Sequence, residues 1–64
     1  MAYLAVDENG DEYIFQSEPK RYMKDGDWIP NYEYDRDYVL VPNGTIEKIL
    51  NYKITWIDNP VEIT

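Results

Sequence analysis

The sequence predicts an α+β fold, in which a small antiparallel sheet of four to five short strands carries one short helix packed on it. An Asn-Gly pair at 9–10 lies between two apolar runs and is typical of a hairpin turn, because both residues tolerate positive φ. The run at 38–41 is continuous and rich in β-branched residues, as in a strand. Ile46, Ile49 and Leu50 recur at the spacing of one helix face.

The strands are expected in five places. Residues 2–6 and 12–16 form the two arms of the hairpin. The run at 38–41 has no polar alternation, which indicates a central strand. Residues 53–57 are expected to be a strand or an extended segment, and the alternation at 61–64 indicates a final edge strand.

The helix is expected at 45–51, with its apolar face on the sheet. Asn43 or Thr45 can cap it, and Glu47 lies in the first turn, where the helix dipole favours an acid. Between the hairpin and the central strand, residues 20–36 contain Gly and Pro and show no clean period. They predict a long acidic, aromatic loop, with one extra turn or short strand as an alternative within it, and loops of this length are usually functional or mobile.

The chain is short and acidic. Residues 1–64 make one domain, and a chain of this size buries only about 60% of the surface of its unfolded form. The net charge of −7 opposes direct contact with nucleic acid and favours basic surfaces, although surface acid also keeps small proteins soluble. With no Cys and no His, stability must come from aromatic packing or from oligomerisation, including a homodimer.

Catalysis is not expected. General acid–base work at neutral pH usually needs His, or another group whose pKa burial has shifted strongly, and this chain has no His and little interior. Carboxylate pairs are available at Asp25 with Asp27 and at Asp35 with Asp37. A chain this small offers no pocket to hold a substrate between them, so we expect no catalytic residues and no cofactor.

A metal site is not expected either. Asp7, Asn9, Asp11 and Glu18 have the spacing of ligands in a calcium loop. Such a loop needs Gly at its sixth position, where this chain has Glu12, and its flanks should be helices rather than strands. A plain hairpin turn is the better interpretation.

The segment 22–38 interleaves aromatic and acidic residues, and the two kinds alternate at 32–38. In an extended conformation, residues 32–38 would carry aromatic rings on one side and carboxylates about 7 Å apart on the other. That row is either a solvated face over a small aromatic core, or a mimic of DNA phosphates that fits the Arg/Lys groove of a partner. Aromatic anchors provide a third interpretation. For an interface, the candidate binding residues are Asp25, Asp27, Trp28, Tyr32, Glu33, Tyr34, Asp35 and Asp37.

Three further segments carry a resemblance. They are residues 7–15, residues 41–49 with their Pro-Asn-Gly-Thr turn, and residues 53–62 around Trp56. Together they resemble short, uncharacterised acidic proteins of bacteriophages, prophages and mobile elements. The resemblance implies a setting, because small acidic phage proteins often bind and block a host protein.

The location expected for the chain is cytoplasmic, in the bacterial host cytosol if it derives from a phage. Residues 1–6 lack the basic start and long apolar run of a signal peptide. No apolar stretch in the sequence approaches the length that spans a membrane, so no membrane partner is expected.

The sequence therefore favours a non-catalytic accessory protein that binds a basic host protein, for instance one that handles nucleic acid or acts in defence. The contact would use the acidic aromatic surface, and the protein would act as an inhibitor. The alternative is a homo-oligomeric structural or assembly protein, with contacts at 61–64 or Trp56. An oligomer that sequesters a small molecule is a further alternative.

Overall fold

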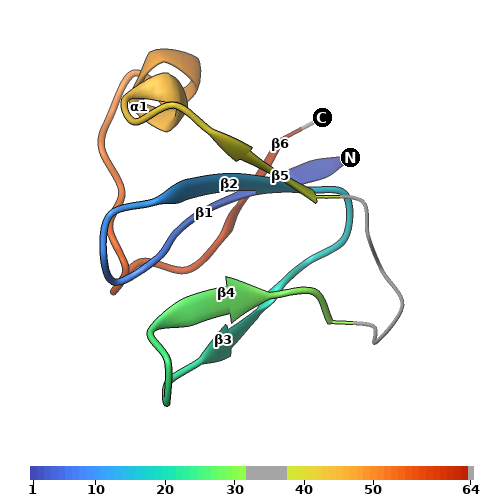
Figure 1. The fold of residues 1–64 in the computed structure, drawn as a ribbon. Coiled ribbons are helices and arrows are strands. Elements are labelled where there is room, and N and C mark those ends of the chain that lie inside the picture. The colour runs from blue at the N-terminus through green and yellow to red at the C-terminus, as the bar shows by residue number, and fades with distance from the viewer. Residues whose placement is uncertain (32–37, 64) are drawn as a thin grey trace.

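The computed structural model of the chain describes residues 1–31 and 38–63. Six short strands and one helix lie in those residues, and together they form an α+β fold (Figure 1). In chain order they are β1 (Ala2–Val6), β2 (Glu12–Phe15), β3 (Lys20–Tyr22), β4 (Asp27–Ile29), β5 (Tyr38–Val41), α1 (Thr45–Leu50) and β6 (Val61–Ile63).

The larger sheet has four antiparallel strands in the order β5-β2-β1-β6. Its centre is the predicted hairpin, in which Leu4 pairs with Ile14. The turn is closed by a hydrogen bond from the Asp7 N–H to the Asp11 carbonyl at 2.8 Å, and Gly10 has a φ of 95°. The Asn-Gly signal therefore identifies the hairpin correctly, because glycine adopts this φ without strain.

Both faces of this sheet are covered, so the fold has three layers (Figure 1). Alternate residues of a strand point to opposite faces. On one face, Leu4 and Val6 pack with Ile46 of α1 and with Ile54. On the other face, Ala5 and Phe15 of the sheet pack with Trp28 of β4. The core is consequently divided into two thin parts, one on each side of the sheet.

The second cover is a β3–β4 hairpin, which lies in the segment predicted to be a long loop. Trp28 pairs with Arg21 across this two-stranded sheet. The loop prediction is wrong for residues 20–29, because strands of three residues are too short to show a period. Burial of the Trp28 ring against the larger sheet holds the hairpin in place.

Strand β5 is an edge strand, so the prediction that it is central is wrong. In the described part of the chain it pairs with β2 alone. Val39 and Leu40 are 55% and 56% exposed. An uninterrupted apolar run normally indicates a strand buried on both faces, and here that inference fails.

The helix is capped from a distant strand rather than by Asn43 or Thr45. Glu12 of β2 accepts hydrogen bonds from the N–H groups of Gly44, at 2.7 Å, and Ile46, at 2.9 Å. The Thr45 hydroxyl donates to the Pro42 carbonyl instead. Glu47 lies in the first turn as predicted. No helix in residues 1–31 and 38–63 is long and apolar enough to cross a membrane.

Apolar residues of the helix face and of the segment after the helix are buried to different degrees. Ile46 is 1% exposed and Leu50 packs against the same core, but Ile49 is 43% exposed. Residues 53–57, expected to be a strand or an extended segment, form no strand: residues 56–57 lie in a turn, and Ile54 is buried. The expected final edge strand is present as β6, paired with β1.

Replacing Glu12 by Ala should destabilise the fold by about 1–2 kcal/mol, the cost of losing a helix cap. Two N–H groups at the start of α1 lose their acceptor, and the helix loses its link to β2. Urea unfolding followed by circular dichroism measures the change. Glu18→Ala removes an exposed carboxylate and should change stability by less than about 0.5 kcal/mol. Equal losses in the two variants would contradict the cap.

Candidate functional site

The two hairpin turns meet at one end of the molecule. The N–H of Glu8, in the β1–β2 turn, donates to the carbonyl of Gly26, in the β3–β4 turn, at 2.9 Å. Gly26 has a φ of 71°, and a Cβ at this position would lie 2.8 Å from the Glu8 Cβ. Only glycine allows this close approach, because any side chain would collide with Glu8.

The meeting of the turns gathers acids that are distant in the sequence. We call Asp7, Glu8, Asp11, Asp25 and Asp27 the acidic end. Asp7 is close enough to Asp11 and Asp27 for both to act on its charge. Glu8 and Asp25 are exposed, so part of this negative charge faces solvent. The acidic end therefore presents a negative surface that is built on paired backbone rather than on a loose tail.

Asp7 is the member that the fold buries. Its side chain is 4% exposed, and its Oδ1 accepts a hydrogen bond from the Trp28 N–H at 2.9 Å. Burial raises the pKa of Asp7, and the charges of Asp27 and Asp11 raise it further, although the Trp28 N–H acts in the opposite direction. Asp7 is consequently a structural link between the sheet and the β3–β4 hairpin.

Trp28 is part of the core, and is not an exposed anchor for a partner. The residue is 7% exposed, and its Nε1 donates to the Val6 carbonyl at 2.9 Å. Its ring meets the Trp56 ring edge-on, with 5.7 Å between centroids. A ring held in this way cannot also insert into a partner, so Trp28 supports the acidic end from below.

Arg21 stabilises the contact between the β3–β4 hairpin and the segment that follows α1. Its guanidinium carbon lies 4.7 Å from the ring centroid of Trp28 and 5.0 Å from that of Trp56. Its Nη2 donates to the carbonyls of Trp56 and Asp58 at 2.9 and 3.0 Å. Such cation–π contacts stabilise most when they are partly desolvated. Arg21 therefore holds the segment after α1 against the β3–β4 hairpin, and Trp56 belongs to this packing.

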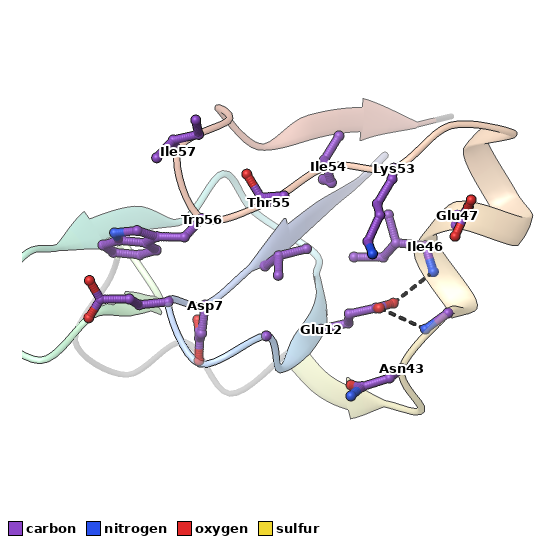
Figure 2. Close-up of a pocket in the computed structure, with 14 residues that line it drawn as sticks. Asp7, Glu12, Asn43, Ile46, Glu47, Lys53, Ile54, Thr55, Trp56 and Ile57 are labelled. Carbon is purple, nitrogen blue, oxygen red and sulfur yellow. Dashed lines mark hydrogen bonds between the residues drawn. The ribbon is translucent and has the colours of Figure 1, made fainter.

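A pocket of about 460 Å³ opens beside the acidic end, between the β1–β2 turn, the start of α1 and residues 53–57. Figure 2 shows Glu12 pointing from β2 to the helix start, while Lys53, Ile54 and Trp56 line the opposite side. Glu12 is already used as the helix cap. The lining mixes apolar residues with four acids and one base, so it favours no single class of ligand; its charged residues are Asp7, Glu8, Glu12, Glu47 and Lys53.

Apart from the buried Trp28, the predicted binding residues separate into two groups. Asp25 and Asp27 lie in the acidic end, beside Glu8 and Asp7. Five others lie outside the described residues, namely Tyr32, Glu33, Tyr34, Asp35 and Asp37. The role of Asp7, Glu8 and Asp11 beside Asp25 and Asp27 is not visible in the sequence, because no local pattern shows that the two turns touch.

The rejected calcium loop corresponds to the turn of the β1–β2 hairpin. The Asn9 side chain is used within that turn, where its Oδ1 accepts from the Asp11 N–H at 3.0 Å. Glu18 lies beyond the end of β2. Within residues 1–31 and 38–63, no three acidic side chains are arranged to hold a metal ion.

Comparisons with known proteins find no similar protein: no family model matches the chain, and no curated protein or solved structure does.

Replacing Asp7 by Ala should destabilise the fold by about 1–3 kcal/mol, because the buried Trp28 N–H loses its acceptor. Asp7→Asn should cost less at pH 7, since an amide oxygen accepts the same hydrogen bond without a buried charge. Urea unfolding of both variants measures the difference. If Asp7→Asn destabilised the fold as much as Asp7→Ala, the role of Asp7 as acceptor for the Trp28 N–H would be contradicted.

Stability should also depend on pH through Asp7. A group whose pKa is raised by folding stabilises the fold when protonated, and that contribution is lost as pH rises through the folded-state pKa. Lowering the pH from 7 towards about 4.5 should therefore favour the wild type over Asp7→Asn. The measurement is the difference in unfolding free energy between the two proteins at each pH. A difference that does not change with pH would show that Asp7 carries no raised pKa.

Proposed function

We propose that this chain is a non-catalytic protein that binds a basic surface of another protein through its acidic end. One observation carries the proposal: the Glu8–Gly26 hydrogen bond joins two turns that hold five acids, and the charges of Asp11 and Asp27 act on Asp7 across this junction. Lys24 is the one basic residue in the described turns at 7–11 and 23–26. A dense negative surface of this kind steers association with a positive one.

The framework of the acidic end supports binding more than it supports chemistry. Asp7 is buried and bonded to backbone, and Trp28 lies beneath it. Glu8 and Asp27 belong to paired backbone, and Asp25 precedes Gly26, whose carbonyl accepts from Glu8, so little order has to be gained on binding. Charges held in fixed positions favour a complementary partner by lowering this entropic cost.

The partner class follows from charge. A protein with a groove of Lys and Arg, such as one that handles nucleic acid, concentrates the positive charge that this end complements. The resemblance to proteins of phages and mobile elements adds a setting, in which the chain blocks a host protein of this type in the bacterial cytosol. The chain would then act as an inhibitor that competes with nucleic acid for the groove.

The experiment begins with capture of partners from a bacterial lysate by the tagged chain, after nuclease treatment and with elution by a salt gradient. A basic protein that elutes as salt rises is the expected partner, because screening weakens charge-led contacts. The purified partner is then titrated with each variant. Recovery of no basic protein would count against the proposal.

Asp25→Asn with Asp27→Asn should weaken binding to that partner about tenfold, equivalent to ~1.4 kcal/mol. Glu18→Gln with Glu62→Gln is the matched control, since it removes the same charge away from the acidic end and should change the Kd less than about twofold. Isothermal titration at two salt concentrations measures both. Equal weakening by the two pairs would show that net charge alone matters.

A further inference from the structure

Strand β5 presents apolar side chains at a sheet edge that no other described strand covers. Tyr38, Val39 and Leu40 are 41%, 55% and 56% exposed. Among the described residues, β5 has a strand neighbour on one side only, namely β2. An edge of this kind offers unpaired backbone N–H and C=O groups, and it is a template for another strand.

The other strand edges of this fold carry charged residues. Glu62 is exposed in the middle of β6. Lys20 lies in β3, and Asp27 lies in β4. Charged side chains at an edge discourage pairing with a further strand, whereas β5 carries no charged residue, no proline and no glycine. Among the described strand edges, β5 is therefore the one least protected against pairing with a further strand.

We propose that β5 pairs with β5 of a second copy of this chain, in an antiparallel two-fold dimer that joins the two larger sheets into one. An uncharged apolar strand fits another uncharged apolar strand, and β5 itself is such a strand. Two chains of charge −7 repel each other, so they can associate only where carboxylates do not meet. A basic partner, by contrast, is suited to the acidic end.

Symmetry limits the register of this pairing. In a two-fold antiparallel pair, the residue at the centre faces its own copy, and its neighbours face each other reciprocally. With Val39 at the centre, Tyr38 lies opposite the partner's Leu40, so all three exposed residues are covered. With Leu40 at the centre, Tyr38 would lie opposite the partner's Pro42, which has no N–H to donate.

Different residue pairs would then meet on the two faces of the joined sheet. Val39 pairs with Ile14, which packs against the core beneath α1, so the two Val39 residues would meet on the helix side. Tyr38 stacks on Phe15 with 5.4 Å between ring centroids, and it would pack on the partner's Leu40 on the hairpin side. Cross-strand pairs of aromatic and aliphatic residues are favourable in antiparallel sheets.

The test is the molar mass in solution of the full chain, measured by sedimentation equilibrium. The wild type should pass from 7.7 kDa to twice that mass over a micromolar range, because a contact through one short strand is smaller than a standard interface. Added salt should strengthen the dimer by screening the charges. This response is opposite to that of a charge-led contact with a basic partner, so the two proposals can fail separately.

Val39→Lys and Val39→Glu provide the decisive variants. Each alone should be monomeric, because like charges would face each other at the two-fold axis. An equimolar mixture should recover the dimer through opposite charges. Ile57→Lys and Ile57→Glu are matched controls at an apolar residue that is 80% exposed away from β5, and both should dimerise like the wild type.

Circular dichroism verifies that each variant keeps the fold, and Leu40→Lys is a second monomeric variant should Val39→Lys unfold. A wild type that stays at 7.7 kDa up to about 500 µM overturns the proposal, since any dimer that forms only above this concentration is too weak to be a specific assembly. Dimeric single-charge variants, or a mixture that stays monomeric, overturn it as well.

Discussion

The contact between Asp7 and Trp28 is the interaction on which the hairpin layer depends. Trp28 gives its backbone N–H to the Asp7 carboxylate and its indole N–H to the Val6 carbonyl. A hairpin of two three-residue strands has too little surface to hold itself against a sheet. Fixed at two points, it covers Ala5 and Phe15 and brings its turn against Glu8.

The helix layer depends on a carboxylate in the same way. Glu12 lies at the other end of the β1–β2 turn and binds the start of α1. A six-residue helix is too short to be stable alone, so this cap and the burial of Ile46 hold it on the sheet. Asp7 and Glu12, one at each end of this turn, therefore attach the two covers to opposite faces, although in the sequence both look like solvated surface charges.

Local signals predicted the parts of the fold that local chemistry decides. The Asn-Gly turn, the helix with Glu47 in its first turn and the final strand are all present. The order of strands in a sheet is decided by contacts between distant segments, so the run at 38–41 did not reveal that β5 lies at an edge. The helix cap by Glu12 was not predicted for the same reason, because it also joins distant segments.

In the candidate site, the difference between what local signals predict and what distant contacts decide is even clearer. The acidity of Asp25 and Asp27 is visible in the sequence, but their neighbours Asp7, Glu8 and Asp11 lie more than a dozen residues away. Only the docking of one hairpin on another brings them together. Trp28 was open to two interpretations, core residue or anchor for a partner, and its burial results from packing on Ala5 and Phe15, which no local pattern encodes.

The pairing of Trp28 with Trp56 around Arg21 has a spectroscopic consequence. Both tryptophans of the chain lie at the junction of the hairpin layer, and the helix layer contains none. Indole emission therefore reports whether the hairpin is docked, while the far-ultraviolet signal of α1 reports the opposite face. Loss of one signal before the other would show that the two covers detach independently, and coincident loss would show that the thin core unfolds as one unit.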